Sequence, residues 1–123
     1  MESLRITGQR PIFGEVEISG NKNAVLPMIP ALMLTDEECV LHNVPDIRDV
    51  RTMLEIAGVL GAEFTFENNT LRFKCSKVRE TTIPRELCSK NRTSILYAAP
   101  LIARCGKAEL YPPGGDEIGR AHV

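Results

Sequence analysis

The chain has 123 residues, of which 43% are apolar and 25% are charged, a composition typical of one soluble globular domain. Fifteen basic and sixteen acidic residues leave a net charge of -1, which excludes a global positive field that would recruit nucleic acid or an anionic membrane surface. Any cationic binding site must therefore be local.

The sequence shows neither a targeting segment nor a metal motif. The N-terminal MESLRITGQR lacks a signal-like apolar core, and the longest apolar stretch, residues 24–34, contains Pro27 and Pro30 and is shorter than a membrane span. We therefore expect a cytoplasmic protein. The four cysteines form no C-x-x-C pair and the two histidines stand alone. We predict no metal site and expect the cysteines to be small buried hydrophobes.

Taken in chain order, the first elements alternate between strands and a helix. LRITG and EVEISG, residues 4–8 and 15–20, alternate polar and apolar side chains and predict a hairpin or two short strands. The apolar run at 24–34 predicts a helix with its prolines near the start. ECVLHNV, residues 38–44, predicts a strand.

The middle of the chain carries the clearest helix and the clearest hairpin. Asp46 can cap a helix that Gly61 can end, and apolar residues recur between them at three- and four-residue spacing. These residues are Val50, Met53, Leu54, Ala57 and Leu60. Residues 62–74 alternate on both sides of Asn68-Asn69, which predicts a β-hairpin.

The last third predicts two helices and a strand. Residues 84–88 suggest a short helix, and RTSILYAAPLIAR at 92–104 predicts an apolar helix with Pro100 inside it. KAELY at 107–111 predicts a strand that leads to the glycine-rich PPGGDEIGR.

The chain also matches itself with a shift of seventy residues. Asn21-Lys22 aligns with Asn91-Arg92, although only four of the 26 aligned positions are identical and chance is a competing explanation. A real repeat would mean one α/β unit of seventy residues that occurs once in full and then begins again, with helices packed on a sheet. The second copy is unfinished at GRAHV, so we expect a truncated part of a longer protein.

A cation opens both apolar helices of this repeat. A helix N-terminus presents free backbone N–H groups and a positive dipole end, so a cation is misplaced there unless an anion binds. Lys22, flanked by the amides of Asn21 and Asn23, suits a phosphate or carboxylate. Gly20 would let the backbone approach that ligand, and Arg92 offers a planar fork for a second anionic group. The alternative is that both cations are solvated surface residues.

The glycine-rich loop is the second candidate site. It lacks the G-K-[ST] of a P-loop and the G-x-G-x-x-G of a dinucleotide fold. As an exposed, mobile loop it could carry the Asp116 carboxyl group over a cleft. The alternative is that Asp116 caps a following helix, as Asp46 is expected to do in the first copy.

Three segments resemble one enzyme family. SGNKNAVLP, LHNVPDIRDVRTMLEIAGVLGAEF and NRTSILYAAPLIARCGKAELYPPGGDEIGR resemble the N-terminal part of the UDP-N-acetylglucosamine enolpyruvyl transferase (UDP-N-acetylglucosamine 1-carboxyvinyltransferase) family. The resemblance covers essentially the whole chain. It implies an α/β fold of two lobes, each with three repeated α/β units in an inside-out α/β barrel, incomplete in this chain. Residues 1–21 would be strands of the C-terminal lobe in a full-length protein, and residues 22–123 the first and part of the second unit of the other lobe.

The resemblance also implies a reaction. Members transfer the enolpyruvyl group of phosphoenolpyruvate to the 3'-hydroxyl of UDP-N-acetylglucosamine and release phosphate, the first committed step of peptidoglycan precursor synthesis, without metal or organic cofactor. Protonation of the methylene carbon creates an oxocarbenium-like centre to which the sugar hydroxyl adds, and loss of phosphate restores the double bond. Such a site needs cations and an acid beside the methylene carbon.

Several residues match functional positions of that family. Lys22 matches the lysine that contacts phosphoenolpyruvate, with Asn23 beside it, and Arg92 matches an arginine that helps hold the substrates. Asp116 stands where most members carry a cysteine as proton donor and a minority carry aspartate, and such a carboxyl needs a raised pKa. The cysteine is the target of the epoxide antibiotic fosfomycin, so a protein with Asp116 should escape alkylation.

The sequence departs from the family after the glycine loop. Members carry I-G-x-R-P-[VI]-D-L, whereas Ala121 stands at the arginine position and leaves its neighbour Arg120 as the candidate for binding the nucleotide sugar. The base and the other substrate arginines would lie in the missing remainder of the chain, so we expect these 123 residues alone to be inactive. The alternatives are a 5-enolpyruvylshikimate-3-phosphate synthase-like enzyme and a non-catalytic truncated binding module.

Overall fold

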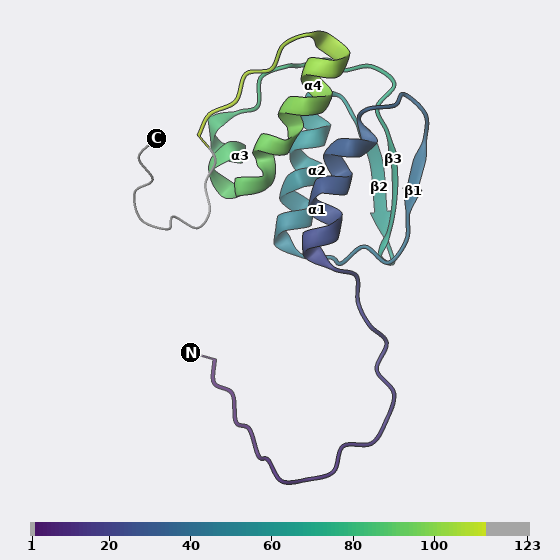
Figure 1. Cartoon of the computed structure of the whole chain (residues 1–123), viewed down its shortest axis with the longest axis vertical. Helices are drawn as coiled ribbons and strands as arrows, with labels where there is room; N and C mark the ends of the chain where they lie inside the picture. Colours follow the sequence, from purple (N-terminus) through teal and green to yellow (C-terminus); the bar gives the residue numbers. More distant parts are fainter. Residues whose placement is uncertain (1, 113–123) are drawn as a thin grey trace.

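The structure, a computed structural model, describes residues 2–112. Its elements are α1 (Lys22–Leu32), β1 (Cys39–Leu41), α2 (Arg48–Leu60), β2 (Glu63–Glu67), β3 (Thr70–Lys74), α3 (Arg85–Lys90), the 3-10 helix η1 (Arg92–Tyr97) and α4 (Ala98–Cys105). The strands form an antiparallel sheet in the order β1-β3-β2, and the helices gather on one side of it (Figure 1). The chain is thus an α/β structure of two layers, as the sequence predicts.

The predicted hairpin is confirmed as β2 and β3. Asn68 and Asn69 form its turn with φ of 51° and 59°, in the left-handed region that asparagine tolerates and that a two-residue hairpin turn requires. The turn also contacts the chain ahead of α2. Asn69 Nδ2 donates to the Val44 carbonyl at 2.8 Å, and the Val44 N–H donates to the Asn69 carbonyl at 2.8 Å. The sheet is therefore tied to the segment from which α2 begins.

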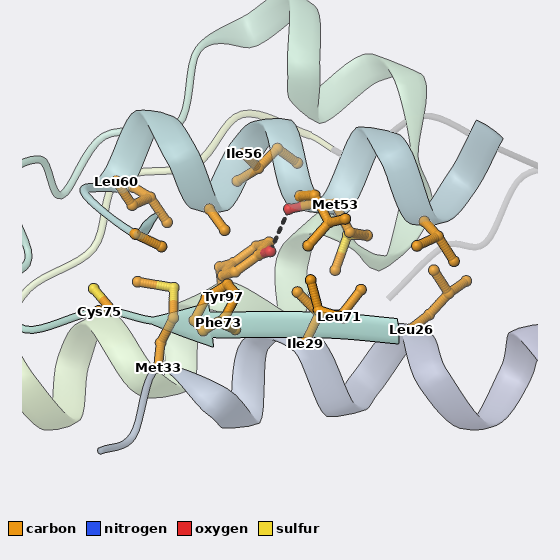
Figure 2. Close-up of a cluster of buried hydrophobic side chains, with 14 of the residues drawn as sticks. Leu26, Ile29, Met33, Met53, Ile56, Leu60, Leu71, Phe73, Cys75 and Tyr97 are labelled. Carbon is orange, nitrogen blue, oxygen red and sulfur yellow. Dashed lines mark hydrogen bonds between the residues drawn. The ribbon is translucent and has the colours of Figure 1, made fainter. Parts of the chain in front are cut away.

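The core fills the space between the helices and the sheet. Leu71 and Phe73 of β3 are buried and lie in one apolar cluster with Ile29 of α1 and Ile56 of α2 (Figure 2). Complete burial of side chains of this size contributes about 1.5–3 kcal/mol each. Helices α1 and α2 therefore depend on the sheet, and the sheet depends on them.

Tyr97 is the largest side chain in this cluster. It is fully buried, and its hydroxyl donates a hydrogen bond to the Met53 carbonyl of α2 (Figure 2). Burial raises the pKa of Tyr97 well above its ordinary value. The neutral phenol consequently anchors η1 to α2 from inside the core.

The start of α2 corrects one prediction. Its N-cap is Ile47, which makes no side-chain cap, and Asp46 instead accepts hydrogen bonds from Arg51 at 2.8 Å and 2.9 Å. The prediction failed because a two-point contact with a guanidinium competes successfully with a single backbone N–H. The predicted end is confirmed: Gly61 has φ 118°, and a Cβ there would lie 2.7 Å from the Lys77 carbonyl oxygen.

The helix predicted over 92–104 is two elements. A 3-10 helix, η1, ends at Tyr97, and the α-helix α4 starts at Ala98. Pro100 lies in the first turn of α4, where its missing N–H removes no helical bond. An unbroken α-helix would bring the proline ring close to the Leu96 carbonyl, which favours the change of helix type just before it. Proline alone does not force such a change, because α1 continues through Pro27 and Pro30, which lie inside the helix and not near its start as predicted.

The predicted terminal strands are wrong within the described residues. No strand forms in residues 2–20, and in 107–111 Glu109 makes only an isolated parallel bridge with Thr82. A strand needs a hydrogen-bonded neighbour, which the alternating pattern cannot supply by itself. Six apolar side chains of the first segment are 82–95% exposed. They are Leu4, Ile6, Ile12, Phe13, Val16 and Ile18. Whether residues 1–21 become strands of another lobe stays a prediction.

The cysteine prediction is right for part of the set. All four thiols are free, and Cys75 and Cys88 are buried, but Cys39 is half-buried and Cys105 is exposed. Burial raises the pKa of the Cys75 thiol, which keeps it protonated. Among residues 2–112, no helix is long and apolar enough to cross a membrane, and no three His, Cys, Asp or Glu side chains are grouped to hold a metal.

Candidate functional site

A pocket of about 320 Å³ lies where the starts of α1, α2 and η1 meet. Its lining residues are Lys22, Asn23, Leu26, Asp49, Lys90, Asn91, Arg92 and Thr93. The structure thus brings together three residues that the sequence singles out, Lys22, Asn23 and Arg92. Asp116 and Arg120 lie outside the described residues.

The two helix starts at this pocket are built in the same way. Asn21 Oδ1 accepts hydrogen bonds from the backbone N–H groups of Asn23 at 2.7 Å and Ala24 at 3.3 Å. Asn91 Oδ1 accepts one from the Thr93 N–H at 3.0 Å. Because Asn21 and Asn91 are aligned by the seventy-residue shift, the shared cap gives the two segments a structural parallel.

These caps change the expected source of anion affinity. The sequence suggests that free backbone N–H groups at the start of α1 would hold an anion, but the Asn21 side chain already accepts two of them. Anion binding in this pocket must therefore depend mainly on its side-chain cations.

The charge of the pocket lining is positive. Three cations, Lys22, Lys90 and Arg92, face one carboxylate, Asp49, so the formal charge of the lining is 3 - 1 = +2. Lys22 Nζ lies 3.2 Å from Asp49 Oδ2, with the two side chains 49% and 36% exposed. An ion pair this exposed is worth about 0–1 kcal/mol, so an anionic ligand could replace Asp49 as the partner of Lys22.

Asp49 also explains how Lys22 is tolerated at the start of α1. The sequence argument holds that a cation there needs a negative partner, and the chain provides one from the first turn of α2. Lys90 has a looser partner, with its Nζ 3.8 Å from Glu55 Oε2. Among the described residues, no salt bridge involves Arg92.

Gly20 does not serve the ligand role suggested by the sequence. A Cβ at this position would overlap the Asn43 carbonyl oxygen and lie 2.9 Å from Pro45 Cδ. The missing side chain therefore permits close packing of the backbone against the loop that precedes α2. Gly20 acts on the site indirectly, through the position of α1.

A second hollow, of about 600 Å³, shares Lys90 with the pocket. It is lined by Arg48, Arg51, Thr52, Glu55 and Lys90. Arg51 is held by Asp46, and its guanidinium stacks over Phe66 at 4.6 Å from the ring centroid. The lining of this hollow has the same formal charge, 3 - 1 = +2, but only the smaller pocket contains residues that the sequence singles out.

Sequence reasoning missed Asp49, Lys90 and Asn91. Asp49 reads as an ordinary acidic residue in the first turn of a helix, and Lys90 as an ordinary basic residue in a last turn. Asn91 carried a usable signal, because it aligns with Asn21 in the repeat.

Comparisons with known proteins converge on one group of enzymes. The family model described as EPSP synthase (3-phosphoshikimate 1-carboxyvinyltransferase) matches residues 6–120. A UDP-N-acetylglucosamine 1-carboxyvinyltransferase of Methylacidiphilum infernorum is 49% identical over 119 residues, which cover 97% of this chain and 28% of that protein. The enzyme of the same name from Treponema denticola is 46% identical over 124 residues, covering 100% and 29%. The chain therefore spans less than a third of the length of these relatives.

A solved structure shows the same fold. The enolpyruvyl transferase NikO from Streptomyces tendae superposes with a TM-score of 0.67 and 22% sequence identity, covering 72% of this chain and 21% of that one. The likeness confirms that the α/β layers described above are part of an enolpyruvyl transferase fold.

Proposed function

Since the chain belongs to the EPSP synthase (3-phosphoshikimate 1-carboxyvinyltransferase) family, we propose that it is part of an enzyme that transfers the enolpyruvyl group of phosphoenolpyruvate to the 3'-hydroxyl of UDP-N-acetylglucosamine and releases phosphate. The observation that carries the choice of acceptor is the identity of 46–49%, over nearly the whole chain, to proteins named for that acceptor. The activity is proposed for a protein of those relatives' length.

The pocket supplies the charge that this donor needs. Phosphoenolpyruvate carries a phosphate and a carboxylate, and the pocket lining has a formal charge of 3 - 1 = +2. In the proposed complex Lys22 exchanges Asp49 for the donor, Asn23 contributes an amide, and the Arg92 fork holds a second anionic group.

The proposed reaction accounts for each proton moved and for each bond formed or broken. Asp116 gives a proton to the methylene carbon C3 of phosphoenolpyruvate, and the sugar oxygen, losing its proton to a base, bonds to C2. The C2–O bond to phosphate then breaks with its electrons going to the phosphate, and C3 returns a proton to the Asp116 carboxylate as the C2–C3 double bond forms again. Asp116 must be protonated at neutral pH, which requires exclusion of water. We assign Arg120 to the nucleotide sugar.

The proposed setting follows from the reaction. UDP-N-acetylglucosamine is a cytoplasmic precursor of peptidoglycan, so the enzyme would act in the cytoplasm and support cell-wall synthesis, cell shape and division. Its partners are small molecules, and we propose neither nucleic acid nor membrane as a partner. No metal or organic cofactor is needed for the steps above.

A chimera tests the choice of acceptor. These 123 residues replace the corresponding 28% of the Methylacidiphilum infernorum relative, and phosphate release is measured with phosphoenolpyruvate plus either UDP-N-acetylglucosamine or shikimate 3-phosphate. We expect release with the nucleotide sugar only. Release with shikimate 3-phosphate only would support the second candidate, which the name of the family model favours. Donor and nucleotide-sugar binding without release would support a non-catalytic module.

The role of Lys22 is tested in the same chimera. Lys22→Ala should raise the KM for phosphoenolpyruvate at least about tenfold, since a charged hydrogen bond is worth about 1.5–3 kcal/mol, and should change nucleotide-sugar binding far less. Lys107→Ala is the control, because Lys107 is exposed and does not line the pocket. Equal effects of the two substitutions would remove Lys22 from the site.

A further inference from the structure

The two cations that define the pocket come from distant parts of the chain. Lys22 is the first residue of α1, and Arg92 is the first residue of η1, seventy residues later. Helices α1 and η1 contact each other, and α2 contacts both. The first part of α2 therefore helps to set the separation of the two cations.

Asp49 of α2 contacts both sides. Its side chain is 3.2 Å from Lys22 Nζ, and its backbone carbonyl accepts a hydrogen bond from Asn91 Nδ2 at 3.3 Å. Asn91 immediately precedes Arg92. One turn of α2 therefore links the segments that carry the two cations.

Of the two residues that Asp49 contacts, Asn91 is the more buried. The residue is only 6% exposed, and its other side-chain atom, Oδ1, accepts from the Thr93 N–H at 3.0 Å and from Thr93 Oγ1 at 2.6 Å. A buried amide with both ends engaged has one favourable orientation, because turning it would leave a donor or an acceptor without a partner.

The rest of η1 is fastened one turn further along α2. Thr93 Oγ1 lies 3.4 Å from Met53 Sδ, and the Tyr97 hydroxyl donates to the Met53 carbonyl. These contacts keep η1 in place without Asn91. What Asn91 adds is a fixed position for Arg92, the first residue of η1.

We propose that Asn91 is a positioning residue for Arg92, and that its hydrogen bond to the Asp49 carbonyl sets the distance between Arg92 and Lys22 that suits an anionic ligand. The inference rests on the proposed function, because it assigns Asn91 to the same anion pocket.

Asn91→Ser separates positioning from capping. A serine hydroxyl can still accept from the Thr93 N–H as an N-cap, but it is too short to donate to the Asp49 carbonyl. The matched control is Asn69→Gly, which removes an amide that donates to the Val44 carbonyl, away from the pocket, while glycine accepts the φ of 59°.

The test titrates inorganic phosphate into the 123-residue chain and follows the backbone NMR signals of Asn23 and Thr93, at a temperature where all variants are folded. We expect Asn91→Ser to weaken phosphate binding by about two- to tenfold, the range for one lost hydrogen bond. Asn69→Gly should leave binding unchanged. Near-ultraviolet circular dichroism should show Tyr97 still packed in both variants.

The outcomes separate the two proposals. Unchanged binding in Asn91→Ser, or equal weakening in both variants, would overturn the positioning role and leave the proposed function standing. A wild-type chain whose Asn23 and Thr93 signals ignore phosphate would overturn the anion pocket, and the positioning role with it.

Discussion

At the scale of single residues, Asp46 and Arg51 form a self-contained charged unit on the surface. Two hydrogen bonds from Arg51 lower the pKa of Asp46, with a smaller opposing effect of burial, and the Arg51 guanidinium lies over the Phe66 ring. A carboxyl group with a lowered pKa stabilises the folded state above its unfolded pKa. This contribution is lost as the pH falls through the folded pKa.

Substitution of Arg51 should expose this effect. In Arg51→Lys the two-point contact is lost, so the pKa of Asp46 should rise towards its ordinary value, as measured by NMR of the carboxyl carbon between pH 2 and 6. The acid-dependent loss of stability should shrink with it. Arg48→Lys, on the same helix, is the control and should leave the titration unchanged. A midpoint that does not move in Arg51→Lys would show that the hydrogen bonds are not the cause.

Asp116 gives a prediction about turnover rather than about substrate binding. In the chimera, Asp116→Ala should abolish phosphate release but leave UDP-N-acetylglucosamine binding largely intact, because a proton donor acts on the donor substrate. Asp116→Cys should convert a fosfomycin-resistant enzyme into one that fosfomycin inactivates. Near-normal turnover of the alanine variant would exclude Asp116 as the acid.

Single residues also show what sequence alone can predict about the site. Lys22 and Arg92 are predicted as site residues because a cation at the start of an apolar helix is electrostatically out of place. Asp49 and Asn91 were not assigned, because their meaning depends on which helices meet in space. Helix-start chemistry is local, whereas the contact between α2 and η1 is not.

At the scale of elements, Gly20 decides how α1 enters the fold. Gly20→Ala should push the chain away from Asn43 and lower the free energy of unfolding by about 1–3 kcal/mol, since the clash is with backbone. Gly8→Ala is the matched control, because a Cβ at Gly8 meets nothing within 4 Å. Urea unfolding measures both. Equal stability of the two variants would contradict the packing described for Gly20.

Elements that form through contacts between residues close in sequence were predicted more accurately than elements that need a distant part of the chain. Helix α2 and the β2–β3 hairpin were predicted because a 3.6-residue pattern and an Asn-Asn turn are local signals. Residues 4–8 and 15–20 carry an equally clear alternation, yet they form no strand in the described structure, because strands require a partner edge. Pro100 was recognised, but its effect on the residues before it was underestimated.

At the scale of the whole molecule, residues 2–18 contribute little to the packed core. The segment exposes its apolar side chains, and a hydrogen bond from Asn43 Nδ2 to the Ile18 carbonyl at 3.4 Å ties its end to the fold. Exposed apolar residues also lie on the helices, where Met28, Ile95 and Ile102 are 47–56% exposed. Such surface promotes association.

Deletion of residues 1–18 should therefore leave the free energy of unfolding nearly unchanged and make the chain more soluble. The shortened chain should unfold cooperatively with a free energy within about 0.5 kcal/mol of the full chain, because few contacts are lost. It should also self-associate less, as measured by sedimentation at increasing concentration. A large loss of cooperativity would show that the segment packs on the core. Phe13→Ser, a single substitution in the same segment, should also improve solubility.

The strand order β1-β3-β2 has a consequence for synthesis on the ribosome. Strand β1 finds its partner in β3, and α2 and β2 must both be made before that pairing is possible. Until Lys74 has left the exit tunnel, the apolar sides of α1 and α2 have no sheet to rest on. During that interval the nascent polypeptide exposes short apolar segments of the kind that chaperones bind.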